Sequence, residues 1–94
     1  MKGYWVAHVT VTDADQYQKY IDGSAIAFNK YQANILARGG QHTIFEGDGH
    51  SRNVIIEFPS YQQALDCYNS PEYQSAKQHR KDAGIANIMI VEGA

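Results

Sequence analysis

The sequence predicts an α+β fold with the order strand, helix, strand, strand, helix, strand. It corresponds to a four-stranded antiparallel sheet with two helices on one face. Three observations support this. Residues 4–11 alternate between apolar and mixed positions. Two segments with helical periodicity each follow a capping residue. A short apolar run, Val54 to Phe58, is bounded by turn-forming residues.

The first half of the chain predicts a strand followed by a helix. In Tyr4–Val11, Trp5 and every second residue after it form an apolar face. Asp13, with Gln16 three residues later, resembles a capping box at a helix start. Aromatic and apolar residues then recur every three or four positions from 17 to 31, and Gly23-Ser24 in the middle suggests a kink.

The central part predicts two more strands. Ile35–Arg38 begins the second, Gly39-Gly40 suggests a bulge or sharp bend, and His42–Glu46 is expected to resume the strand. A glycine-rich turn over residues 47–51 leads into the third strand at Asn53–Phe58.

The last part predicts a helix in two pieces and a final strand. Ser60, with Gln63 three residues later, marks the helix start. Ser70-Pro71 breaks and restarts it, because proline is favoured at the first helical position. Ile85–Val91 then forms the fourth strand, which is apolar on both sides.

This order matches the ferredoxin-like arrangement, in which the first and third strands are adjacent at the centre of the sheet. Right-handed crossovers place both helices on one face. We expect that face to carry Trp5, Ala7, Val9, Val11, Val54, Ile56 and Phe58. The opposite face would present Tyr4, Val6, His8, Thr10, Asn53, Ile55, Glu57, Asn87, Met89 and Val91. This second set is too apolar for free solvent, so a second copy of the sheet is expected to cover it.

Composition narrows the range of partners. The 94 residues suffice for one domain, 1–94. A formal net charge of −2 argues against nucleic acid or an anionic membrane as the main partner. A lone cysteine, Cys67, cannot form an intramolecular disulfide, and no apolar run has the length of a membrane span. A cytoplasmic location is therefore predicted.

A set of residues spread over nearly the whole chain forms a recognisable pattern: Gly3-Tyr4-Trp5, Val11-Thr12-Asp13, Tyr31, Arg38-Gly39-Gly40, Glu46-Gly47, Arg52–Ser60, Ala64, Tyr68, Ser70–Tyr73 and Val91–Gly93. Its most specific part runs from Arg52 to Tyr73. In these residues the sequence resembles an uncharacterised bacterial family of the dimeric α/β-barrel superfamily. The resemblance implies a homodimer in which two four-stranded sheets close into a barrel. Relatives in the superfamily include cofactor-independent monooxygenases and muconolactone isomerase-like proteins, so kinship of fold does not select one reaction.

His8 and Glu57 are the predicted catalytic residues. Both fall on the same face of neighbouring central strands, where a carboxylate could orient the imidazole of a general base if the registers align. Such a pair suits proton abstraction next to a carbonyl group. The alternative is a structural pair that sets the register of a dimer.

Three further residues are predicted to bind a ligand. Arg38 lies before the Gly-Gly bend and could hold a carboxylate, or else pair with an acid of the protein. Asn53 shares the parity of Glu57, and Tyr4 could offer a hydroxyl group. Arg52 is a weaker candidate of the same kind as Arg38.

Other reactive side chains are interpreted as structural. Arg80 is expected to interact with a helix C-terminus, and Cys67 to be an inert, packed thiol. The four histidines, at positions 8, 42, 50 and 79, lack tight ligand spacing, so no metal site and no cofactor are predicted.

The sequence is compatible with two functions. The preferred hypothesis is a homodimeric small-molecule-binding domain or cofactor-independent enzyme, of isomerase, tautomerase or monooxygenase type, acting on a small metabolite. The alternative is a non-catalytic dimeric module whose polar interior specifies assembly.

Overall fold

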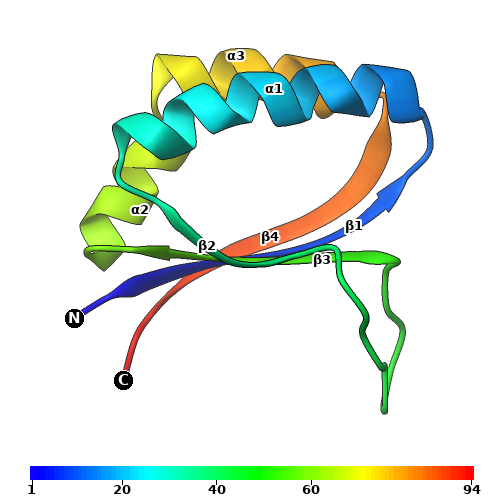
Figure 1. Ribbon diagram of the computed structural model, residues 1–94, viewed down its shortest axis with the longest axis horizontal. Helices are drawn as coiled ribbons and strands as arrows, with labels where there is room; N and C mark the ends of the chain where they lie inside the picture. The colour runs from blue at the N-terminus through cyan, green and yellow to red at the C-terminus, as the bar shows by residue number, and fades with distance from the viewer.

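The computed structural model describes residues 1–94 as one antiparallel sheet with helices on a single face (Figure 1). The strand order is β2-β3-β1-β4, so the first and third strands are central, and the predicted ferredoxin-like α+β class is confirmed. The strands are β1 (Gly3–Val11), β2 (Asn34–Arg38), β3 (Arg52–Phe58) and β4 (Gly84–Glu92). The helices are α1 (Ala14–Lys30), α2 (Tyr61–Tyr68) and α3 (Pro71–Arg80).

All three helices begin at a capping side chain. The carboxylate of Asp13 accepts the backbone N–H of Gln16 at 3.1 Å, and Ser60 Oγ accepts that of Gln63 at 3.0 Å. Ser70 Oγ accepts the N–H of Tyr73 at 3.1 Å, and Pro71 occupies the first turn. The predicted break at Ser70-Pro71 is therefore confirmed as the boundary between α2 and α3.

Gly23 does not interrupt α1, which is continuous from Ala14 to Lys30. Instead, Gly23 allows α1 and α3 to approach each other closely. A Cβ atom at position 23 would lie 3.0 Å from the Cβ of Ala76 on α3, which is tighter than ordinary contact. The absent side chain thus lets α1 and α3 lie directly against each other, side by side above the sheet (Figure 1).

The core lies between the sheet and the helices. Trp5 from β1 is 1% exposed, while Ile56 and Phe58 from β3 are 1% and 0% exposed. Val54 on the same strand is half-buried and packs against this cluster. The predicted division of β1 and β3 into a helix-facing and an opposite face is confirmed, because side chains alternate between faces along a strand.

The predicted second half of the second strand is wrong. Residues 41–50 form no strand, and the chain leaves the sheet after Arg38. Gly39 makes the expected bend, at a φ of 69° that favours glycine. The bulge itself comes earlier, because the register with β3 shifts between Ile35 and Ala37. Four glycines between residues 39 and 49 disfavour a regular strand, and the apolar side chains of Ile44 and Phe45 stay exposed instead of packing on the sheet.

The face of the sheet opposite the helices is uncovered. Ile55, Met89 and Val91 on this open face are 39%, 59% and 47% exposed. The loop between β2 and β3 projects from the same side (Figure 1) and exposes 89% of Phe45. No helix of the protein is long and apolar enough to cross a membrane.

We expect Phe58→Ala to lower the free energy of unfolding by about 3–5 kcal/mol, because the change removes a fully buried ring and leaves a cavity. Urea denaturation would measure it. The matched control is Ile26→Ala on α1, where 64% of the side chain is exposed, and it should change stability by less than about 1 kcal/mol. Equal effects of the two substitutions would contradict the assignment of the faces.

Candidate functional site

Four of the five predicted site residues lie on the open face. Tyr4 pairs with Glu57 across β1 and β3, and His8 pairs with Asn53 in the same ladder. His8 and Glu57 are therefore four residues apart along the ladder, or about 13 Å at the usual strand rise. The registers do not bring the two together, and the expected hydrogen bond between them is not formed.

Glu57 is bound by Tyr4 instead. The Tyr4 hydroxyl donates to Glu57 Oε2 at 3.1 Å, and Lys2 Nζ lies 4.0 Å from the other carboxylate oxygen. The hydrogen bond to this carboxylate, together with partial burial, raises the pKa of the Tyr4 hydroxyl, because a phenolate there would face a second negative charge. Tyr4 thus stays protonated and acts as a donor that orients Glu57.

His8 joins a polar network that also holds the β2–β3 loop. Its Nδ1 lies 2.6 Å from Asn53 Oδ1, and Asn53 Nδ2 donates to the carbonyl of His50 at 3.1 Å. The His50 ring lies between Thr10 Oγ1, at 2.7 Å, and Asn87 Nδ2, at 3.1 Å. Side chains of three strands, β1, β3 and β4, therefore fix the end of the loop against the sheet.

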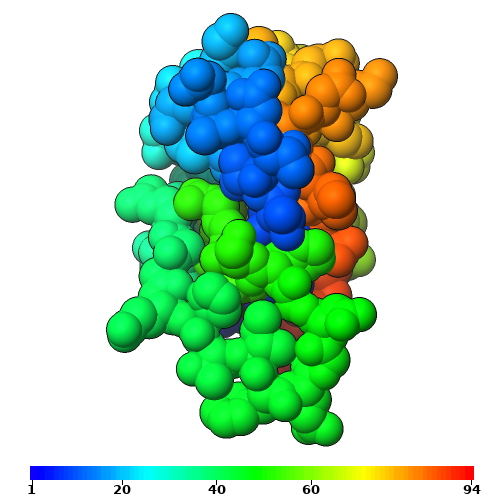
Figure 2. All heavy atoms as spheres, turned by 90° about the vertical axis from the view of Figure 1, so that its right-hand side faces the viewer, coloured from blue at the N-terminus to red at the C-terminus, as the bar shows by residue number.

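A hollow of about 400 Å³ lies beneath this loop. Figure 2 shows it between the green loop and the strands behind. Three histidines line it (His8, His42 and His50), together with Glu46 and Asp48. No three of the histidine, cysteine and carboxylate side chains of the protein converge closely enough to hold a metal ion. The hollow is almost wholly polar, unlike the cavity on the other face.

Arg38 lies on the helix-facing side of the sheet, away from the other four predicted residues. It pairs with Val54, whose side chain packs towards the helices. The expectation of one cleft containing Arg38 together with Tyr4, His8, Asn53 and Glu57 is therefore wrong. The physical reason is the period-2 alternation of a strand, which the bulge after Ile35 resets by one residue.

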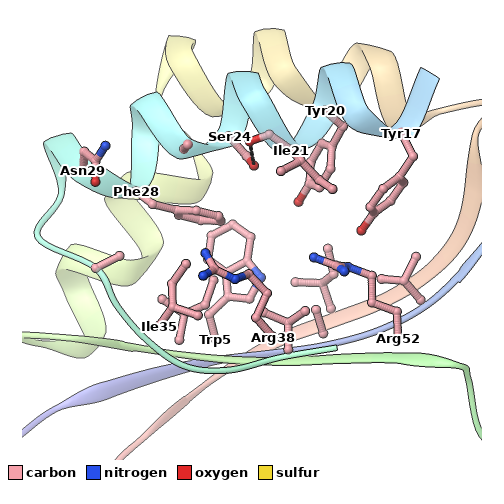
Figure 3. Close-up of a pocket in the computed structure, with 17 residues that line it drawn as sticks. Trp5, Tyr17, Tyr20, Ile21, Ser24, Phe28, Asn29, Ile35, Arg38 and Arg52 are labelled. Atoms are coloured by element: carbon pink, nitrogen blue, oxygen red, sulfur yellow. Dashed lines mark hydrogen bonds between the residues drawn. The ribbon is translucent and has the colours of Figure 1, made fainter. Parts of the chain in front are cut away.

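Arg38 and Arg52 both point into a cavity of about 360 Å³ between α1 and the sheet (Figure 3). Thirteen of its 17 lining residues are hydrophobic, so its walls are suited to an apolar molecule. Trp5 and Phe28 form one end, and Tyr17 and Tyr20 descend from α1 at the other (Figure 3). The cavity exists because α1 packs mainly on α3 and not on the strands below it.

A buried polar cluster lies behind the cavity wall. Arg80 Nη1 donates to the hydroxyl groups of Tyr20, at 3.2 Å, and Tyr73, at 2.8 Å. The two hydroxyl groups lie 2.8 Å apart. Arg80 lies in the last turn of α3, the helix end with which it was expected to interact, but it is only 9% exposed and has no carboxylate partner. Burial raises the pKa of both tyrosines, since a buried phenolate would be poorly solvated.

The arrangement of protons in this cluster is constrained. Arg80 only donates, so one tyrosine must donate to the other and one hydroxyl proton is left without a protein acceptor. Tyr73 is fully buried, whereas Tyr20 lines the cavity. If the Tyr73 hydroxyl donates to that of Tyr20, the buried Tyr73 proton has an acceptor. Tyr20 can then donate its own proton to a molecule in the cavity.

Cys67 is fully buried, as expected for a packed thiol. Burial raises its pKa to about 12, so almost none of it is thiolate at neutral pH. It lies on α2 and is not part of the cavity lining.

Tyr20, Tyr73 and the contribution of α1 to the site were not predicted from the sequence. The signal available was their helical spacing, which equally fits plain core packing. Nothing in the sequence brings Tyr20 and Arg80 together, because 60 positions separate them.

We expect Tyr73→Phe to lower the free energy of unfolding by about 1–3 kcal/mol, because it deprives the buried Arg80 of an acceptor. Chemical denaturation would measure it. Tyr61→Phe is the matched control, since Tyr61 is 38% exposed and no protein group binds its hydroxyl. A cost for Tyr73→Phe as small as that of the control would contradict the cluster described above.

Comparison with solved structures places this architecture among proteins of diverse origin. A protein of unknown function from Rhodopseudomonas palustris has a TM-score of 0.80 at 18% identity, covering 99% of this chain and 82% of that one. SnoaB, a cofactor-independent oxygenase from Streptomyces nogalater, has a TM-score of 0.66 at 10% identity, with coverage of 99% and 93%. A dimeric ferredoxin-like protein of unknown function from Thermobifida fusca has a TM-score of 0.64 at 15% identity, with coverage of 100% and 91%.

At these identities the likeness establishes the fold and nothing further. No curated protein matches the sequence. One family model does, from residue 2 to residue 94, and it describes a domain of unknown function. With almost the whole chain matched, the protein belongs to the DUF1330 family.

Proposed function

We propose that this protein binds a small organic molecule in the cavity between α1 and the sheet. The observation that carries the proposal is the cavity itself, about 360 Å³ with mostly hydrophobic walls and a few converging polar groups. Its polar side chains come from separate elements: Ser24 and Asn29 from α1, Arg38 from β2 and Arg52 from β3. A ligand-binding role explains why a chain this short leaves space beside its core.

The chemistry proposed for this site needs no cofactor. Tyr20 offers a hydroxyl proton at the wall, and its contact with Arg80 favours a negative charge developing nearby. Isomerisation, tautomerisation or cofactor-independent oxygenation of a small metabolite would each use such a donor. The fold of SnoaB, itself a cofactor-independent oxygenase, is in keeping with the last of these. The cytoplasm remains the proposed compartment, since Cys67 is a free thiol.

We further propose that the open face is the contact surface of a homodimer. Exposed apolar side chains gather there: Ile55 on β3 and Ile85, Met89 and Val91 on β4. The β2–β3 loop projects on the same side, where it would reach around a second sheet (Figure 1). The similar protein from Thermobifida fusca is dimeric. In such a dimer Tyr4, His8, Asn53 and Glu57 would lie at the interface.

The alternative function follows from this same surface. If the polar groups of the open face only fix the register of two sheets, the protein is a non-catalytic dimeric module. The catalytic roles of His8 and Glu57, and the ligand-binding roles of Tyr4 and Asn53, stay predictions. Their separation on the ladder favours two independent polar contacts over one catalytic pair.

Native mass spectrometry of freshly purified protein is expected to show a discrete added mass that organic extraction removes. Val54→Phe should abolish it, because the larger side chain fills the cavity from β3. Ile26→Phe is the matched control, since it adds a ring on the exposed side of α1 and should retain the added mass. A wild-type protein free of added mass, with Trp5 fluorescence unchanged by a panel of aromatic and aliphatic metabolites, would support the non-catalytic module.

Met89→Lys should convert the dimer to a monomer without unfolding it, because a lysine on the open face would place a charge inside the interface. Sedimentation velocity would measure the change. Ile26→Lys is the control with the same added charge on α1, and it should remain dimeric. In parallel, loss of the dimer in both His8→Ala and Glu57→Gln would assign these residues to assembly. Intact dimers of both variants would contradict a role in assembly.

A further inference from the structure

The charges in the cavity indicate what kind of molecule it takes, an inference that rests on the proposed function. Only two of its lining residues are ionised, Arg38 and Arg52, and no carboxylate lines it. Neither arginine belongs to the two salt bridges of the protein, Lys2–Glu57 and Lys30–Glu72. Arg52 is half-buried, so its positive charge favours a counter-charge in the cavity, whereas Arg38 on the edge strand β2 is exposed.

The two arginines are placed to act on one group. Arg38 pairs with Val54 on the adjacent strand, and Arg52 lies two residues from Val54 on the same face. Such diagonal neighbours are roughly 7–8 Å apart at their Cα atoms. Both side chains rise from the sheet into the space below α1 (Figure 3). One acidic group between them can therefore meet both guanidinium groups.

Arg52 is held in place yet remains unsatisfied. Its guanidinium carbon lies 5.7 Å from the centre of the Tyr17 ring, a cation–π contact from α1. A Cβ atom at residue 39 would come within 3.0 Å of Arg52 Nη1, so Gly39 leaves room for this side chain. Arg52 Nε is buried and has no hydrogen-bond partner. A buried N–H group without an acceptor is unfavourable, and an acceptor on a bound molecule would remove that penalty.

The apolar lining of the cavity would hold the other part of the ligand. Trp5 and Phe28 meet edge to face, with ring centres 5.2 Å apart, and Ile35 and Ile56 add aliphatic surface. None of these four side chains is charged, so they favour an apolar group of the ligand. We propose that the ligand is an amphipathic organic acid: a flat, apolar ring system against Trp5 and Phe28, and one carboxylate between Arg38 and Arg52.

A matched pair of probes tests this. 2-Naphthoate and 2-naphthalenemethanol share the ring system and differ in the acidic group, and calorimetry measures the affinity of each. The acid should bind the wild-type protein at least about tenfold more tightly than the alcohol, as expected for charge-assisted hydrogen bonds. The affinity for the acid should also fall as the salt concentration rises, while that for the alcohol should not.

Substitution of each arginine tests where the carboxylate of naphthoate binds. Arg52→Gln and Arg38→Gln should each weaken binding of naphthoate by about tenfold or more and leave binding of the alcohol unchanged. Arg52→Lys keeps the charge but loses the forked donor, so it should restore part of the affinity. Lys19→Gln removes the same charge from the exposed side of α1 and should change neither affinity.

The outcomes separate the two proposals. Equal affinities of the wild-type protein for acid and alcohol would overturn the organic-acid inference and leave a neutral-ligand cavity. Absence of binding for both probes, and for the smaller pair benzoate and benzyl alcohol, would overturn the binding function as well. The comparison of acid with alcohol in the wild-type protein decides the inference even if an arginine variant does not fold.

Discussion

Packing around Trp5 is the interaction on which the rest of this structure depends. The ring lies on the central strand β1 and is 1% exposed. It contacts aromatic rings from four other elements: Phe28 on α1, Phe58 on β3, Tyr68 on α2 and Tyr73 on α3. The centroid distances, 4.8–6.1 Å, and the mostly tilted geometries are those favoured by aromatic pairs. One side chain thus ties all three helices to the sheet.

This one-sided packing divides the molecule into two surfaces with different physical chemistry. On the helix side, α1 packs mainly against α3, and the space between α1 and the sheet forms the cavity that Arg38 and Arg52 line. On the open side, carboxylate, imidazole and amide groups form short local contacts beside exposed apolar residues. Strands β1 and β3 supply both surfaces, because successive side chains along each strand point to opposite faces of the sheet.

The fold was largely predictable because its signals are local. Alternation in β1, capping by Asp13, Ser60 and Ser70, and the apolar run at Val54 to Phe58 each depend on neighbouring residues alone. The element order then selects the topology.

The site was less predictable because it depends on long-range register. The four-residue separation of His8 from Glu57 follows from how β1 aligns with β3, which is set by the intervening helix and strand. The bulge after Ile35 sends Arg38 to the helix side, and no feature of the Ile35–Arg38 sequence marks it. The cluster of Tyr20, Tyr73 and Arg80 joins two helices whose alignment is a property of the folded chain.

The contact between Gly23 and Ala76 influences the cavity from outside its lining. Gly23 does not line the cavity, yet the spacing it permits between α1 and α3 sets where the roof of the cavity lies. A single added methyl group at this position would require α1 and α3 to move apart by a few tenths of an ångström, while every side chain that lines the cavity stayed the same. The dimensions of the cavity therefore depend partly on a contact between two helices, at a position that does not itself line the cavity.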